Sequence, residues 1–172
     1  VKVSHAPTGP VFGIVMHETM EKIYKENLQT DGAIAAFDKS LSIHEAEIID
    51  TMSAKEMKEY GHKLIKNLFE SYIPNSCKDV RLEEEIHVTL VDNLPINGII
   101  DKLEFDGDTV RVVDYKTGSA LHGIEELSVG GNYWRQAVFY NILLEESANI
   151  DTNGKTIETR YVFLDDDSQE NG

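Results

Sequence analysis

Two aspartates and a lysine stand in segments whose alternating pattern would otherwise place only apolar side chains on one side. Asp101 shares a predicted strand face with Ile99. Asp114 shares one with Val112, and Lys116 follows two residues later on the same side. A buried carboxylate is costly unless it is paired with a cation or bound to a metal. The three residues therefore predict a divalent-metal site built for hydrolysis.

The residue types suit hydrolysis of a phosphodiester. Carboxylate oxygens favour a hard cation such as Mg²⁺ or Mn²⁺. A phosphodiester is an anion that repels hydroxide, so its hydrolysis needs positive charge where the transition state gains negative charge. A metal held by Asp101 and Asp114 would polarise the phosphoryl oxygen and acidify a bound water. Lys116 would orient or deprotonate that water, or stabilise the developing charge.

Alternating strands joined by a tight turn must position these residues. Residues 96–105 alternate, and the segment Asp106-Gly107-Asp108 predicts a turn after which residues 109–116 return antiparallel. Residues 86–90 and 157–164 also alternate and are expected to be strands. One face of the second strand is expected to carry Ile99, Asp101, Leu103 and Phe105.

Helical periodicity covers the segment before these strands. Residues 11–28 predict a helix that carries His17 on an apolar stripe, and a short weak helix is expected to begin at Asp31. The segments Ser42–Glu45 and Ser53–Glu56 both fit an S-x-x-E capping box. Pro74 blocks further helix.

A last helix is expected over residues 133–146, with Gln136 and Tyr140 one turn apart. The order of helices, three strands, a helix and a strand predicts an α/β or α+β fold in which a mixed sheet is flanked by helices.

The 172 residues suffice for one ordinary domain. We expect a mainly helical part (1–75), a core of sheet and helix (80–164) and an acidic tail (165–172). No run approaches the roughly 18 apolar residues of a membrane span, so we expect a cytoplasmic protein without a membrane partner. A single cysteine, Cys77, excludes an Fe–S cluster held by cysteines.

The net charge is strongly negative, with 16 Lys and Arg against 31 Asp and Glu, for a total of −15. Phosphate binding depends on Lys and Arg. Composition alone would therefore argue against a nucleic acid ligand, so the motifs have to decide the question.

Four motifs occur in a characteristic order. Gly98-Ile99-Ile100-Asp101 is followed by Val112-Val113-Asp114-Tyr115-Lys116-Thr117-Gly118, then by a Q-x-x-x-Y segment at 136–140, and all are preceded by a G-x-x-x-H-E segment at 13–18. Together these resemble the RecB-like branch of the PD-(D/E)XK nuclease superfamily. The resemblance implies a restriction-endonuclease-like α/β fold, with an N-terminal helical segment.

The resemblance also implies roles for individual residues. The implied ligands of one metal ion, Mg²⁺ or Mn²⁺, are the side chains of His17, Asp101 and Asp114 and the main-chain carbonyl of Tyr115. Lys116 would be the catalytic lysine, and Gln136 and Tyr140 would position the DNA backbone or the lysine. Glu85 matches a glutamate that the family often has near the site.

The implied function is a metal-dependent DNA nuclease, acting as an exonuclease on single strands that a linked helicase unwinds during recombination and repair. The helicase domains would belong to the parent chain or to a partner subunit. An acidic chain would then have weak, salt-sensitive affinity for DNA by itself.

Other interpretations stay open. The same fold could be a catalytically silent, DNA-guiding or docking module, although silent copies lose the aspartates and the lysine. His17 alone could be an ordinary core histidine. Asp101 could lie on a surface hairpin, because Lys102 and Glu104 line the opposite side of its strand. An acidic calcium-binding domain is disfavoured, because the chain has no D-x-D-x-D-G loop.

Overall fold

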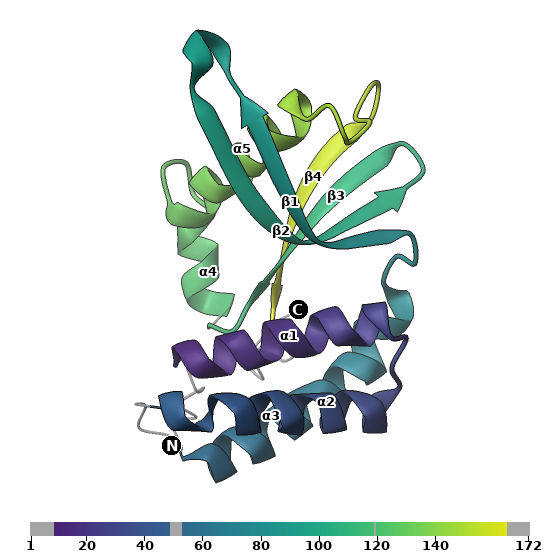
Figure 1. Ribbon diagram of the computed structural model, residues 1–172, viewed down its shortest axis with the longest axis vertical. Coiled ribbons are helices and arrows are strands. Elements are labelled where there is room, and N and C mark those ends of the chain that lie inside the picture. Colours follow the sequence, from purple (N-terminus) through teal and green to yellow (C-terminus); the bar gives the residue numbers. More distant parts are fainter. Residues whose placement is uncertain (1–8, 49–52, 119, 165–172) are drawn as a thin grey trace. The chain divides into compact units, whose positions relative to one another are not determined.

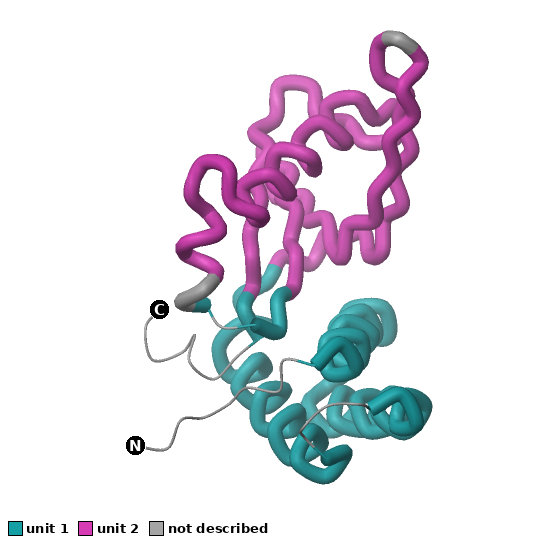
Figure 2. Tube along the Cα trace, turned by 90° about the vertical axis from the view of Figure 1, so that its left-hand side faces the viewer, with its two compact units in different colours: residues 1–76, 116–120, 163–172 teal, residues 77–115, 121–162 magenta. Residues whose placement is uncertain are grey.

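A computed structural model describes residues 9–48, 53–118 and 120–164, so the predicted acidic tail lies outside the described residues. The chain forms two compact units, which Figure 2 shows in different colours. The helical unit comprises residues 1–76, 116–120 and 163–172, and the sheet unit comprises residues 77–115 and 121–162.

Three long helices form the helical unit: α1 (Pro10–Lys25), α2 (Thr30–His44) and α3 (Ala54–Ser71). Short 3₁₀ turns follow at Glu45–Glu47 and Ile73–Asn75. The core contains an aromatic cluster, in which the Phe12 ring lies 6.0 Å from that of Phe37 and 5.5 Å from that of Tyr60, measured between centroids. In the part of the chain that the structure describes, no helix is long and apolar enough to cross a membrane.

One of the two expected capping boxes forms. The Ser53 hydroxyl accepts from the Glu56 amide while the Glu56 carboxylate accepts from the Ser53 amide, which confirms a capping box at the start of α3. The box predicted at Ser42 is wrong, because Ser42 lies inside α2. That helix is also longer than the short helix expected at Asp31. Its buried face reaches Leu41, so tertiary packing outweighs the local capping signal.

A polar cluster joins α1 to α2. The Glu18 carboxylate accepts a hydrogen bond from the Ser40 hydroxyl and lies 3.2 Å from Nε2 of His44. His44 also contacts Glu47 through Nδ1, at 3.2 Å. The glutamate of the G-x-x-x-H-E segment therefore holds the two helices together.

The sheet unit contains four strands in the order β1-β2-β3-β4: β1 (Val80–Thr89), β2 (Pro95–Asp106), β3 (Thr109–Lys116) and β4 (Thr156–Phe163). The first three pair antiparallel. Along β4, Thr156 donates to the carbonyl of Asp108 and Leu164 donates to that of Lys116, so β4 runs parallel to β3. The expected mixed sheet is confirmed (Figure 1).

Two helices accompany the sheet. Helix α5 (Asn132–Glu146) packs Tyr140, Leu143 and Leu144 into the core of the sheet unit. Helix α5 was expected from the sequence, whereas α4 (Ala120–Glu126) was not. The described residues thus hold five α-helices with the sheet, which agrees with the expected restriction-endonuclease-like fold.

The side of β2 that enters the core changes at Asp101. Ile100 and Leu103 are fully buried, whereas Ile99 is 55% exposed, so the single apolar face expected through Ile99 is wrong. The ladder between β1 and β2 keeps its register but skips Glu83 and Asp101. Glu83 has a φ of +46°, a left-handed conformation that interrupts the strand. The irregularity therefore lies directly opposite Asp101.

Candidate active site

Asp114 is the most enclosed of the predicted site residues that carry a carboxylate. Its side chain on β3 is 4% exposed. Its Oδ1 accepts a hydrogen bond of 2.7 Å from the Tyr140 hydroxyl and one of 3.0 Å from Nε2 of Gln136. The same Gln136 nitrogen donates to the Tyr140 oxygen at 2.8 Å. Because Gln136 and Tyr140 are one turn apart on α5, both side chains reach the same carboxylate.

Asp101 lies partly buried on the neighbouring strand. Its Oδ2 accepts a hydrogen bond of 2.9 Å from the main-chain amide of Tyr115, the residue after Asp114. Burial, and then the charges of Asp114 and Asp101, raise the pKa of the Tyr140 hydroxyl far above its usual value. Tyr140 therefore keeps its proton and remains a hydrogen-bond donor.

The glycine of the G-x-x-D segment lets α5 approach the sheet. A Cβ built at Gly98 would lie 2.7 Å from Cδ1 of Leu143 and 3.1 Å from Cε1 of Phe139. Leu143 is fully buried, so it has little room to move. Gly98 thus sets how closely the helix that carries Gln136 and Tyr140 packs on β2.

The two charged residues that left a surface hairpin open for Asp101 are buried. Lys102 and Glu104 are 0% and 1% exposed, and Nζ of Lys102 lies 2.9 Å from Oε1 of Glu104. Arg111 contacts the other oxygen of Glu104 at 3.0 Å. Burial raises the pKa of Glu104, but Lys102 and Arg111 outweigh burial and hold that pKa below its usual value. Lys102, Leu103 and Glu104 are therefore all buried, and the surface-hairpin interpretation is wrong.

Tyr115 on β3 also contacts β2 through its side chain. Its side chain is buried, and Nζ of Lys102 lies 5.8 Å from the centre of its ring. Packing of the ring on one side and the hydrogen bond from its amide to Asp101 on the other hold the main chain between Asp114 and Lys116.

Tyr161 on β4 was not anticipated from the sequence. Its hydroxyl donates to the main-chain oxygen of Tyr133 at 2.6 Å, and the two rings stack with centroids 5.0 Å apart. The pKa of Tyr161 is raised by burial and by the charge of Asp114. Tyr161 thus connects β4 to the first turn of α5. Strand alternation places it on a face but carries no signal for this contact.

His17 and Lys116 belong to the helical unit. His17 is partly buried on α1. Lys116 is the last residue of β3, and its carbonyl accepts from the Leu164 amide at 2.7 Å. The structure brings together Asp101, Asp114, Gln136 and Tyr140 within the sheet unit. The roles of His17 and Lys116 stay predictions.

The donor chemistry of the two aspartates fits a hard divalent cation. Within residues 9–48, 53–118 and 120–164, no group of three or more His, Cys, Asp or Glu side chains is placed to hold a metal ion. Magnesium, however, is often bound in proteins through only one or two carboxylates, with water and substrate oxygens as the other ligands. Asp101 and Asp114 supply carboxylates of that kind from adjacent strands.

A comparison with protein families shows which family the chain belongs to. The model of the PD-(D/E)XK nuclease superfamily matches residues 2–172. The chain belongs to this superfamily. Among curated proteins, the comparison found no match. Members of the PD-(D/E)XK superfamily are nucleases and generally use divalent metals such as Mg²⁺, so membership indicates nuclease activity for this chain.

Proposed function

We propose that the chain is a divalent-metal-dependent deoxyribonuclease that acts as an exonuclease on strands unwound by a linked helicase. The observation that carries the proposal is the pair of aspartates on β2 and β3. Asp114 is buried and held at Oδ1 by Gln136 and Tyr140, and Asp101 is held by the amide of Tyr115. Carboxylates fixed in this way are oriented before a substrate arrives.

Asp101 and Asp114 would hold a divalent cation, with His17 and the Tyr115 carbonyl as further ligands. When bound, the cation supplies positive charge at the phosphoryl oxygen and activates a water. Gln136 and Tyr140 act through Asp114: their hydrogen bonds keep its carboxylate in one orientation.

Lys116 completes the proposed set. As the last residue of β3 it follows Asp114 by two positions, so the strand directs both side chains to one side. Its ammonium group would orient the attacking water or stabilise the negative charge of the transition state.

The negative charge of the chain supports delivery of DNA by helicase domains rather than capture of DNA by this chain. A net charge of −15 opposes capture of a polyanion. Helicase domains, in the parent chain or in a partner subunit, would unwind DNA and guide single-stranded ends to the aspartates. In this proposal the protein works in DNA recombination and repair.

The test is digestion of oligonucleotides labelled at the 5′ or the 3′ end, single- and double-stranded, linear and circular, with Mg²⁺, Mn²⁺ or a chelator. We expect metal-dependent release of short products from linear strands and none from circles. Asp114→Asn keeps the shape of the side chain but removes its charge, and we expect the rate to fall by about 10³-fold. We expect Lys116→Met to lower the cleavage rate by a comparable factor.

The matched control is Asp108→Asn, which removes the same charge from the exposed turn between β2 and β3. It should cleave at the parental rate. If Asp114→Asn and Lys116→Met cleave as fast as the parent chain, the proposed site is wrong. If the parent chain cleaves nothing with either metal, the silent DNA-guiding module is favoured instead.

A further inference from the structure

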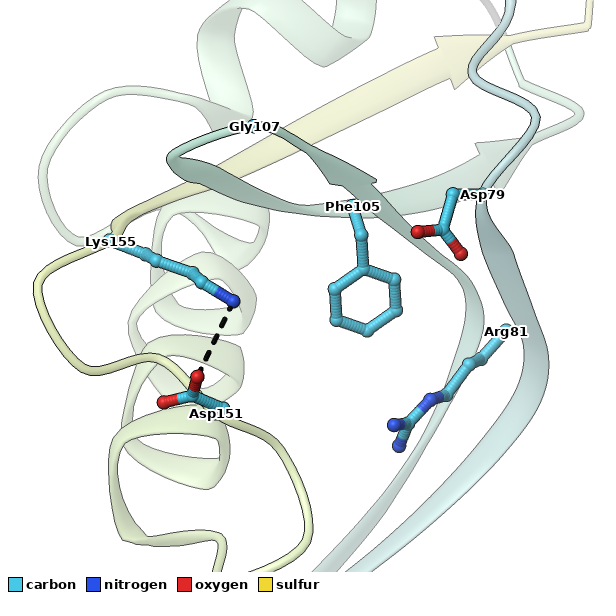
Figure 3. A pocket seen from close by; sticks show the side chains of 6 residues that line it. All are labelled: Asp79, Arg81, Phe105, Gly107, Asp151 and Lys155. Atoms are coloured by element: carbon cyan, nitrogen blue, oxygen red, sulfur yellow. Dashed lines mark ion pairs between the residues drawn. The ribbon is translucent and has the colours of Figure 1, made fainter.

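A pocket lies at the hairpin end of the sheet unit. It has a volume of about 370 Å³ and is lined by Asp79, Arg81, Phe105, Gly107, Asp151 and Lys155. Figure 3 shows Lys155 and Asp151 on one side, Arg81 and Asp79 on the other, and the Phe105 ring between them. The lining comes from the start of β1, the β2–β3 hairpin and the segment between α5 and β4. Small-molecule sites in proteins begin at about this volume.

The pocket is separate from the paired aspartates. Phe105 is four residues beyond Asp101 on β2, which corresponds to roughly 13 Å along a strand. Between them lies Leu103, which is fully buried in the core. None of the residues that line the pocket has a role in the proposed hydrolysis.

The floor of the pocket combines an aromatic ring with a guanidinium group. The Arg81 guanidinium carbon lies 5.2 Å from the centre of the Phe105 ring. The guanidinium also donates to the carbonyl of Asn149 at 3.4 Å, which ties β1 to the segment after α5. An aromatic ring beside an arginine is the combination on which nucleic acid bases stack.

The two cations of the pocket, Arg81 and Lys155, both make long ion pairs. Nζ of Lys155 lies 3.7 Å from Asp151, whose side chain is 75% exposed. Arg81 lies 3.3 Å from Glu84. Such pairs contribute little free energy, so a phosphate can replace the carboxylate partner.

Two carboxylates also face the pocket, and they restrict what it accepts. Asp79 and Asp151 would repel a bare anion, but a carboxylate accepts hydrogen bonds from the exocyclic amino group of a base. The lining thus matches a ligand with a phosphate, a flat aromatic ring and an amino group on that ring.

We propose that this pocket binds one nucleotide whose base carries an exocyclic amino group. The base would lie against Phe105 and Arg81 and donate to a carboxylate, while Lys155 would contact the phosphate. The nucleotide would be either a free monophosphate or the end of a DNA strand. The choice of a nucleotide as the ligand rests on the proposed nuclease function. Binding in this pocket needs neither the aspartate pair nor a metal.

The experiment is a titration of the isotope-labelled chain followed by amide chemical shifts, in chelator so that metal-dependent hydrolysis is absent. The probes are deoxycytidine monophosphate (dCMP), a four-residue deoxycytidine oligonucleotide, thymidine monophosphate (dTMP), deoxycytidine and inorganic phosphate. We expect dCMP to shift the Gly107 and Lys155 amides saturably. Affinity should be at least tenfold weaker for dTMP, the nucleoside and phosphate. Binding of the oligonucleotide as well as dCMP would identify strand ends as a second source of the ligand.

Variants localise the binding. Arg81→Gln and Lys155→Gln should each weaken dCMP binding about tenfold, whereas Arg160→Gln, which removes one cation from the exposed surface of β4, should not. Two variants from different segments guard against a loss of folding in either one. The proposal is overturned by the absence of saturable shifts at Gly107, by equal affinity for dTMP or phosphate, or by unchanged binding in both variants. Loss of nuclease activity alone would not bear on it.

Discussion

At the scale of single residues, the site depends on how the Asp114 carboxylate is held. Its Oδ1 receives one donor from the Tyr140 hydroxyl and another from the Gln136 amide. Tyr140 is 6% exposed and its pKa is raised by burial and by both aspartates, so it donates at neutral and alkaline pH alike. A ligand carboxylate whose neighbours fix its orientation binds metal more tightly than one that rotates.

Tyr140→Phe should therefore weaken metal use while leaving the fold in place. The variant keeps the ring in the core but loses the 2.7 Å hydrogen bond to Asp114. We expect activity or apparent Mg²⁺ affinity to fall by about 10–100-fold, and the free energy of unfolding to fall by only about 1 kcal/mol. Cleavage rates across a Mg²⁺ titration and urea denaturation measure the two effects. Tyr60→Phe, in the helical unit, is the control, and an unchanged Mg²⁺ dependence would contradict the role of Tyr140.

At the scale of elements, the position of α5 on the sheet decides whether its two polar side chains reach Asp114. Gly98→Ala would place a Cβ 2.7 Å from Leu143 and push the helix away from β2. We expect a loss of about 1–3 kcal/mol in unfolding free energy, with a parallel fall in activity. Urea denaturation tests the first effect. The control is Gly118→Ala, where a Cβ meets nothing within 4 Å, and equal stability losses in the two variants would rule out the close approach.

The junction of α1 and α2 should respond to pH. The pKa of His44 is raised by its hydrogen bonds with Glu18 and Glu47, and the pKa of Glu18 is lowered by Ser40 and His44. Because the folded state binds the His44 proton more tightly, the stabilisation is complete below the unfolded pKa of about 6.5. It is lost as pH rises through the higher folded value.

His44→Gln should therefore lower the melting temperature more at pH 5.5 than at pH 9. Calorimetry at the two pH values measures the difference. The control is His87→Gln, which removes an exposed pair with Glu85 in the sheet unit and should have little effect at either pH. A His44→Gln effect that is constant with pH would show that His44 contributes only neutral contacts.

At the scale of the whole molecule, the charge of −15 should dominate encounters with DNA. Asp114→Asn and Asp108→Asn have the same net charge, so their DNA affinities can be compared directly in chelator. We expect both to bind a single-stranded oligonucleotide weakly, and to lose that binding as salt rises from 50 to 200 mM. Fluorescence anisotropy measures this binding. Tight, salt-independent binding would contradict the proposal that helicase domains deliver the DNA.

Local patterns in the sequence were sufficient for most of the elements. The tight turn Asp106-Gly107-Asp108 sets the register of β2 against β3, and β3 has the predicted bounds. That register brings Asp101 on β2 beside Asp114 on β3. The order of the four motifs likewise led to the superfamily that the family model matches.

Only the tertiary structure decided which atoms meet. Gln136 and Tyr140 are 22 and 26 residues from Asp114, so their hydrogen bonds depend on how α5 packs on the sheet. Gly98 permits the close approach of α5 to β2. Periodicity describes the faces of one element at a time. The burial of Lys102, the change of face at Asp101 and the contact of Tyr161 with α5 all depend on packing between distant segments, which no local pattern encodes.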